Sequence, residues 1–206
     1  MADDDATLLE AWRGGDASAG SALFERHFVS VFRFFAAKLG DVAAQDLSQR
    51  TFVAVIQSRD SLREGSKFRA YLLAVARNQL LMHLRTRGRR GVDAALEESC
   101  IDELLPSPDS ALAGSEQERL IVRGLRRMPL DQQILLELHY WEELSTEELG
   151  EILGVPRGTV KSRLFRARDE LRSQLASLVR DPELRESSIR DLEQWVARIR
   201  AARPAG

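Results

Sequence analysis

The residues best suited to recognition chemistry lie in segment 157–168, which reads RGTVKSRLFRAR. The segment carries four arginines and one lysine, and these side chains donate hydrogen bonds to phosphates and to guanine bases. A basic helix with a solvated face has the same composition, since runs of charge commonly face water. The placement of the cations favours nucleic-acid binding, because they occupy the first half of a predicted second helix, the part that enters a DNA major groove.

Two short predicted helices position this segment. Ser145 and Glu148 have the S-x-x-E spacing in which a hydroxyl and a carboxylate cap the first turn of a helix. Gly154-Val155-Pro156 ends that helix, because glycine accepts left-handed backbone angles and the residue before proline is disfavoured in a helix. The second helix begins near Arg157 and places one stripe toward a core: Val160, Leu164, Ala167 and Leu171. Two helices joined by a glycine-containing turn are typical of a helix-turn-helix.

Composition excludes several classes of function. The 206 residues have a formal net charge of -2, so the chain is no polycation, although its charges are segregated along the sequence. Cys100 is the only cysteine, which leaves neither a disulfide nor a thiolate metal site. His27, His83 and His139 show no metal-ligand spacing, so we interpret them as structural or surface residues and predict no metal and no cofactor. No apolar run approaches the ~20 residues that span a bilayer and no signal pattern opens the chain, so we predict a cytoplasmic protein without membrane insertion.

The first part of the chain predicts a helical bundle. No order is expected from Met1 to Asp5, and helices are expected from Ala6 to near Gly14, from Ser18 to Leu39 and from Ala43 to Ser58. The third helix is predicted to turn apolar residues inward and polar ones outward. The inward set is Leu47, Phe52, Val53 and Ile56, and the outward set is Asp46, Gln49 and Arg50. The β-branched alternation of strands is absent.

A long fourth helix is predicted from Ser66, after the polar loop RDSLREG. Its basic end has a simple explanation, since the helix dipole favours cations in a last turn. That effect does not explain the cations in and after the loop, which are Arg63, Lys67, Arg69 and Arg77. Basic residues interleaved with Phe68 and Tyr71 suit a nucleic-acid strand that lies over a stacking platform, although each aromatic is also a candidate for the core.

The composition changes again at residue 92, which divides the chain. Residues 92–115 contain six acidic residues, no Lys or Arg, and the turn-forming Pro106-Ser107-Pro108, so we predict a flexible acidic linker. The expected fold is all-α, with two small helical domains at residues 6–91 and 116–178. A C-terminal helical extension at residues 179–206 has an apolar stripe, which we hypothesise packs on a protein domain; a modest extension of the last domain is the alternative. The stripe consists of Ile189, Leu192, Val196 and Ile199.

Two separated segments resemble one protein family. MPLDQQILLELHYWEELSTEELGEILGVPRGTVKSRLFRARDEL is similar to region four, the promoter-reading domain of bacterial sigma factors. DVAAQDLSQRTFVAVIQSRDSLREGSKFRAYLLAVARNQLLMHLRTRGRR resembles region two of the compact extracytoplasmic-function (ECF) group. The resemblance implies binding to core RNA polymerase, at the clamp helices of the largest subunit and at the flap region, with recognition and melting of promoter DNA. It also implies an anti-sigma factor or other regulator as a partner.

The resemblance further implies the site residues. The minus-35 element would be read by Lys161, Ser162, Phe165 and Arg166, with Arg157, Thr159 and Arg163 on phosphates. A base flipped from the minus-10 element and the melted strand would meet Leu62, Arg63, Gly65, Ser66, Lys67, Arg69, Tyr71, Arg77 and Asn78. Extruding a base costs a few kcal/mol, so a pocket and stacking surfaces are required there. The polymerase contact would consist of Asp46, Leu47, Gln49, Arg50 and Phe52.

Three residues depart from the family pattern and leave alternatives open. Arg50 stands where Glu is common, Leu62 replaces a frequent aromatic, and Tyr71 replaces a frequent Trp. The competing interpretation is a stand-alone helix-turn-helix regulator with an N-terminal helical sensor or dimerisation domain, which would bind DNA without polymerase. An enzyme is not expected, because the sequence has neither a carboxylate pair with catalytic neighbours nor a nucleotide-binding glycine loop.

Overall fold

The computed structural model describes residues 4–59, 67–88 and 123–178. Within these ranges the secondary structure is helical and no strand occurs, so the predicted all-α fold class is confirmed. The chain divides into two compact units, Met1–Asp93 and Ala94–Gly206, and each is described by itself. None of the helices in the described ranges combines the length and the hydropathy needed to cross a bilayer.

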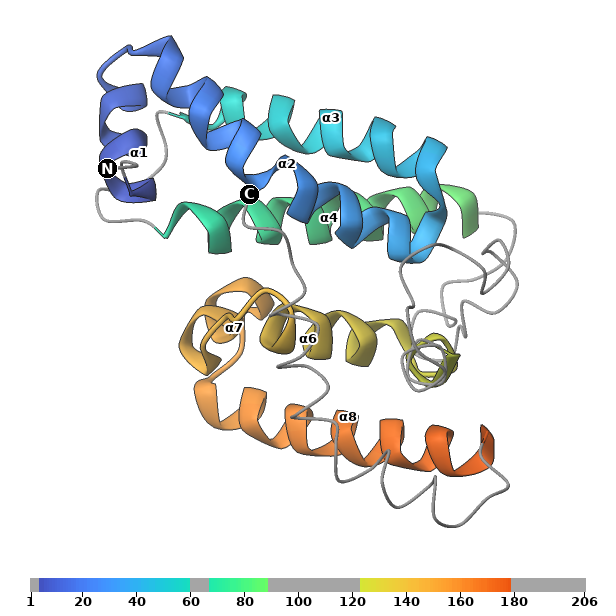
Figure 1. The fold of residues 1–206 in the computed structure, drawn as a ribbon. Coiled ribbons are helices and arrows are strands. Elements are labelled where there is room, and N and C mark those ends of the chain that lie inside the picture. Colours follow the sequence, from blue (N-terminus) through green and yellow to red (C-terminus); the bar gives the residue numbers. More distant parts are fainter. Residues whose placement is uncertain (1–3, 60–66, 89–122, 179–206) are drawn as a thin grey trace. The chain divides into compact units, whose positions relative to one another are not determined.

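Four helices build the first unit (Figure 1): α1 (Asp5–Arg13), α2 (Ala17–Leu39), α3 (Asp41–Gln57) and α4 (Phe68–Gly88). α2 is the central element, because it packs against α1, α3 and α4. Gly40 alone joins α2 to α3, and its φ of 78° is a conformation that other residues rarely adopt. The glycine therefore lets α3 fold back along α2, and α3 in turn packs on α4.

The orientation of α3 differs from the sequence prediction. Val53 and Ile56 were expected to face inward, but they are 51% and 50% exposed. Leu47 and Phe52 are buried as predicted, and the rest of the buried stripe consists of Ala44, Ser48, Thr51 and Val55. The hydroxyl of Thr51 donates to the Leu47 carbonyl at 2.7 Å, so this polar group is satisfied inside the bundle. The prediction was wrong for Val53 and Ile56 because it ranked side chains by hydropathy, whereas the buried positions follow the helical spacing of the stripe.

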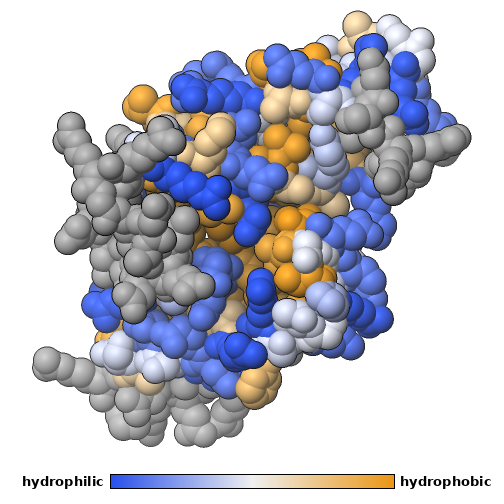
Figure 2. Space-filling model, turned by 180° about the vertical axis from the view of Figure 1, so that it is seen from behind, coloured by the Kyte–Doolittle hydropathy of each residue, from blue (hydrophilic) through white to orange (hydrophobic). Residues whose placement is uncertain are grey.

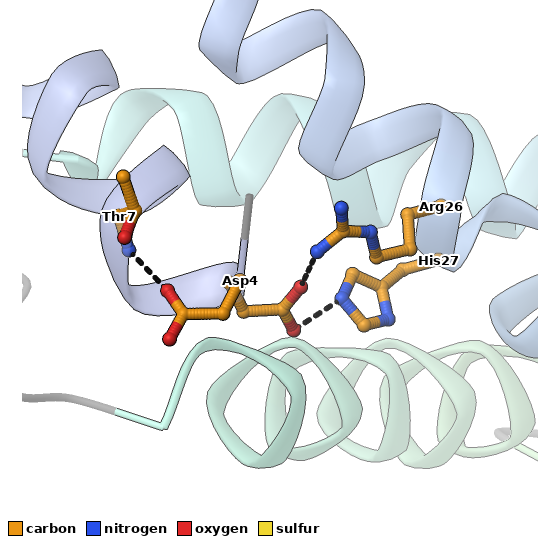
Figure 3. Close-up of polar contacts among 5 residues, drawn as sticks. Asp4, Thr7, Arg26 and His27 are labelled. Carbon is orange, nitrogen blue, oxygen red and sulfur yellow. Dashed lines mark hydrogen bonds and ion pairs between the residues drawn. The ribbon is translucent and has the colours of Figure 1, made fainter. Parts of the chain in front are cut away.

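The start of α1 also differs from the prediction, since Asp4 and Asp5 are ordered (Figure 3). Asp4 caps the helix by accepting a hydrogen bond from the Thr7 N–H at 2.8 Å. The Asp5 carboxylate accepts from Arg26 at 2.7 Å and lies 2.6 Å from Nε2 of the buried His27. The hydrogen bond with His27 and then that with Arg26 hold the pKa of Asp5 below its ordinary value of 3.8. These contacts tie α1 to α2, and they make His27 a structural residue, as predicted.

The second unit contains α6 (Leu130–Tyr140), α7 (Thr146–Leu153) and α8 (Arg157–Leu178), each packed on the other two (Figure 1). The predicted cap of α7 is present. The Glu148 N–H donates to Ser145 Oγ at 3.2 Å, and the Ser145 N–H donates to the Glu148 carboxylate at 2.8 Å. Gly154, with φ of 64°, ends α7, so the predicted helix-turn-helix is confirmed.

Several predicted features lie outside the described residues. They are the loop 62–66, the acidic linker 92–115, the start of the second domain up to residue 122 and the extension 179–206. The short stretch 123–126, which precedes α6, is helical. The domain boundaries at 91, 116 and 178 stay predictions.

Candidate nucleic-acid interface

α8 has a buried seam and an exposed cationic face. Val160, Leu164, Ala167 and Leu171 are at most 2% exposed, so the predicted seam is confirmed. Of the seven residues predicted to meet DNA on this helix, Thr159 is half-buried. The other six are exposed, and they are Arg157, Lys161, Ser162, Arg163, Phe165 and Arg166. Phe165 is 60% exposed, which leaves an aromatic ring available for a contact outside the unit. The helix therefore presents cations, a hydroxyl and a ring on a surface that folding does not use.

Arg157 is held at the start of α8 by the preceding helix. Its NH1 lies 2.6 Å from the Glu147 carboxylate, and its Nε donates to the Thr146 hydroxyl at 3.2 Å. The backbone N–H of Glu147 lowers the pKa of its carboxyl, and the Thr146 hydroxyl and the cations of Arg157 and Lys161 lower it further. The ion pair is exposed, so it contributes mainly to the orientation of Arg157 and little to stability.

The predicted strand-binding residues of the first unit fall into three groups. Lys67 and Asn78 are exposed, while three others are half-buried: Arg69, Tyr71 and Arg77. Leu62, Arg63, Gly65 and Ser66 lie outside the described residues. Phe68 is 1% exposed and packs edge-to-face on Trp12, with ring centroids 6.4 Å apart, so it belongs to the core and not to a stacking platform.

α3 offers a mixed polar and apolar surface. Asp46, Gln49 and Arg50 are exposed, and Arg50 Nε lies 3.0 Å from the Asp46 carboxylate, in an ion pair of adjacent turns. Leu47 and Phe52, predicted for the same surface, are buried and therefore support α3 from inside. Figure 2 shows that hydrophobic residues reach the molecular surface between hydrophilic ones. The large hydrophobic residues that are exposed on α3 are Val42, Val53 and Ile56.

Sequence reasoning missed two contacts around the end of α3. Ser58 Oγ and the Tyr71 hydroxyl lie 2.6 Å apart, which joins the end of α3 to the start of α4. The Arg59 guanidinium, just after α3, lies over the Trp12 ring of α1, 5.9 Å from its centroid. No local signal pointed to these contacts, because the partners are distant in sequence.

Two protein-family models match the chain. One, described as Sigma-70 region 2, matches residues 23–90, and the other, described as Sigma-70, region 4, matches residues 118–171. The first match covers most of α2 with α3 and α4, while α1 precedes it. The second match covers the helix-turn-helix. The fold and the two surfaces thus define the class: a protein with sigma-70 regions 2 and 4.

Similar curated proteins narrow this class. The RNA polymerase sigma-H factor of Pseudomonas aeruginosa is 28% identical over 188 residues, which covers 87% of this chain and 97% of that protein. The ECF RNA polymerase sigma-E factor of Escherichia coli K12 is 28% identical over 185 residues, covering 85% of this chain and 96% of that protein. The chain belongs to the ECF-type RNA polymerase sigma factors, which are DNA-binding transcription initiation factors.

Solved structures share the fold. The sigma factor RpoE from Bartonella quintana, in complex with the anti-sigma factor NepR, has a TM-score of 0.61 and 26% identity. That comparison covers 76% of this chain and 96% of the solved one. CnrH, solved with the cytosolic domain of CnrY, has a TM-score of 0.62 and 22% identity, and it covers 85% of this chain and 99% of the solved one.

Proposed function

We propose that this sigma factor binds core RNA polymerase through α3, reads the minus-35 element through α8, and binds the melted minus-10 strand beside the start of α4. Core polymerase, through its clamp helices and flap region, and promoter DNA are the proposed partners. The observation that carries the proposal is the division of α8 into a fully buried seam and an exposed face of cations with one ring. Such a face fits a major groove, where Arg and Lys donate to guanine and a ring contacts a thymine methyl.

The residue roles on α8 follow from position. Lys161, Ser162, Phe165 and Arg166 are exposed along the helix, which suits contact with base edges. Ser162 donates its hydroxyl to the Thr159 carbonyl at 2.9 Å, so its oxygen keeps lone pairs that accept from a base amino group. We assign three residues to phosphate contacts: Arg157, Thr159 and Arg163. The ion pair with Glu147 holds the Arg157 guanidinium in place before DNA binds.

The proposed polymerase contact is the exposed surface of α3. Asp46, Gln49 and Arg50 contribute polar groups, and Val53 and Ile56 contribute apolar area that the fold leaves in water. These two side chains supply apolar area that a partner can bury, next to polar groups that it can pair. Leu47 and Phe52 act indirectly, since their burial fixes the rotation of α3.

The proposed minus-10 surface consists of Lys67, Arg69, Tyr71, Arg77 and Asn78, together with the loop residues Leu62, Arg63, Gly65 and Ser66. Cations that follow a strand backbone next to an aromatic ring are typical of single-strand binding. A regulator is a further proposed partner. The structure of the similar RpoE with the anti-sigma factor NepR supports an anti-sigma factor in that role.

Run-off transcription tests the proposal. Purified core polymerase is incubated with a promoter library, with and without the full-length chain, and the RNA ends are mapped. We expect start-site-specific RNA only when the chain is present, together with a stable assembly of chain and core in gel filtration. Sequence-specific DNA binding without assembly or RNA would instead indicate a stand-alone helix-turn-helix regulator.

A further inference from the structure

A side-chain hydrogen bond joins the end of α3 to the start of α4. Ser58 is the C-cap residue of α3, and Tyr71 lies in the first turn of α4. Their oxygens are 2.6 Å apart, across 13 residues of sequence. Ser58 Oγ also lies 2.8 Å from the Ala54 carbonyl and 3.2 Å from the Val55 carbonyl. Either hydroxyl can donate in the bond between Ser58 and Tyr71.

Residues next to this bond pack around the Trp12 ring. The Arg59 guanidinium lies over the Trp12 ring, and Phe68 packs edge-to-face on the same ring. Trp12 is itself buried and packs edge-to-face on Phe24, with centroids 5.3 Å apart. α1 therefore supports the residues that flank Ser58 and Tyr71, although α1 lies before the stretch that matches the region 2 family model.

The bond restricts the ring of Tyr71, which is half-buried and is the one aromatic ring assigned to the proposed minus-10 surface. The hydroxyl oxygen of a tyrosine lies on the axis about which its ring rotates, so a contact there fixes the first side-chain torsion, and with it the position of the ring, but not the rotation of the ring about that axis. Burial does not fix the position alone, since Tyr71 is only half-buried whereas Phe68 is fully enclosed. A ring held at one position accepts a stacked base without first losing the freedom of that torsion.

We propose that Ser58 is a positioning residue for Tyr71, and that this bond sets the ring for stacking on an unpaired base of the melted strand. The inference rests on the proposed function, because it needs Tyr71 to face DNA. Ser58 itself touches no nucleic acid in this arrangement. Its effect on melting passes entirely through the position of the Tyr71 ring.

Open-complex formation tests the assignment. Holoenzyme is assembled from core polymerase and the full-length chain on a promoter that the wild-type holoenzyme selects, and melting is measured by permanganate reactivity of unpaired thymines. We expect Ser58→Ala and Tyr71→Phe each to lower the melting equilibrium constant about threefold to tenfold, the factor that corresponds to ordering one side chain on binding. The double variant should fall no further than Tyr71→Phe, and Ser58→Thr, which keeps the hydroxyl, should melt DNA like wild type.

Two readouts separate positioning from a general loss of structure. Core affinity should be unchanged in Ser58→Ala, and its defect should persist on a template with a premelted bubble, because strand capture and not duplex opening depends on the ring. Ser21→Ala is the matched control, because Ser21 Oγ also donates to a backbone carbonyl four residues earlier, that of Ala17. Within the part of the chain that the structure describes, Ser21 has no hydrogen bond to a tyrosine. This variant should melt DNA like wild type.

Several outcomes overturn the inference. The assignment of Ser58 as a positioning residue would be wrong if Ser58→Ala melted DNA like wild type. It would also be wrong if the effects of Ser58→Ala and Tyr71→Phe multiplied in the double variant, or if the premelted bubble restored wild-type behaviour to Ser58→Ala. A wild-type chain that melts no promoter would instead contradict the proposed function itself. The two failures are therefore distinguishable in one set of reactions.

Discussion

The exposed apolar residues of α3 allow the proposed polymerase contact to be tested quantitatively. Val53 and Ile56 are 51% and 50% exposed, so half of each side chain is still in water. Val53→Ala removes two carbons and Ile56→Ala removes three, and each carbon that leaves water contributes about 0.8 kcal/mol. Because only the exposed half is newly buried at an interface, the pair contributes about 2 kcal/mol there, which corresponds to about a 30-fold change in Kd.

The assay is a titration of labelled core polymerase with the wild-type chain and with the double variant, each checked for folding by circular dichroism. Val29→Ala is the matched control, because Val29 is 51% exposed but belongs to α2. Val29→Ala removes the same two carbons as Val53→Ala at the same exposed fraction. A difference in core affinity between these two variants therefore reports whether the residue lies on α3 or on α2. The reasoning is refuted by a folded double variant that binds core as tightly as wild type, or by Val29→Ala that weakens binding as much as Val53→Ala.

Three further predictions concern α8, α7 and α1. Arg163→Gln should reduce the slope of log affinity against log salt by about 0.9 in promoter binding by the holoenzyme, since one phosphate contact is lost. Gly150→Ala should lower the free energy of unfolding by about 1–2 kcal/mol in thermal melts, because its Cβ would lie 2.9 Å from the Val155 carbonyl oxygen. Asp5→Asn should cost about 1–2 kcal/mol of stability near neutral pH, after allowance for partial exposure. The folded-state pKa of Asp5 lies below 3.8, so this stability is present above that pH and disappears as pH falls through the folded pKa.

Each of these predictions has a control. Arg172→Gln on α8 should keep the wild-type salt slope, because Arg172 is paired with Asp169 at 2.7 Å and lies outside the proposed contact set. Gly158→Ala meets no atom within 4 Å, so it should be neutral or stabilise by up to ~1 kcal/mol. An Asp5→Asn variant that differs from wild type equally at pH 7 and below pH 3.8 would contradict a charge-dependent role.

Local signals predicted much of the second unit from sequence alone. The Ser145 cap, the Gly154 stop and the seam of α8 each depend on residues within a few positions of one another, and all three occur in the structure. The exposed face of α8 followed from the same periodicity, because the residues left outside a predicted seam face solvent.

Contacts between distant residues were beyond local signals. Asp5 meets Arg26 and His27 at sequence separations of 21 and 22, so the acidic N-terminus looked unstructured. The rotation of α3 depends on how closely α2 and α4 approach it, and hydropathy alone placed Val53 and Ile56 on the wrong side. The first error also passed over a local signal, because Asp4 caps α1 through Thr7 three residues further on. The second is an error of helical register, because Val53 and Ile56 fall outside the stripe that the buried residues of α3 form.

The ion pair on the α3 surface also predicts how binding to core polymerase depends on salt. A second acid beside Asp46 would give two negative charges, whereas Arg50 pairs with Asp46 at 3.0 Å and leaves this part of α3 neutral. Binding to core polymerase should then depend mainly on Val53 and Ile56, with little contribution from charge. Core affinity should consequently change little between about 0.1 and 1 M salt, although the Debye length falls from about 10 to about 3 Å. A steep loss of affinity over that range would show that the Asp46–Arg50 pair opens and that its charges bind polymerase separately.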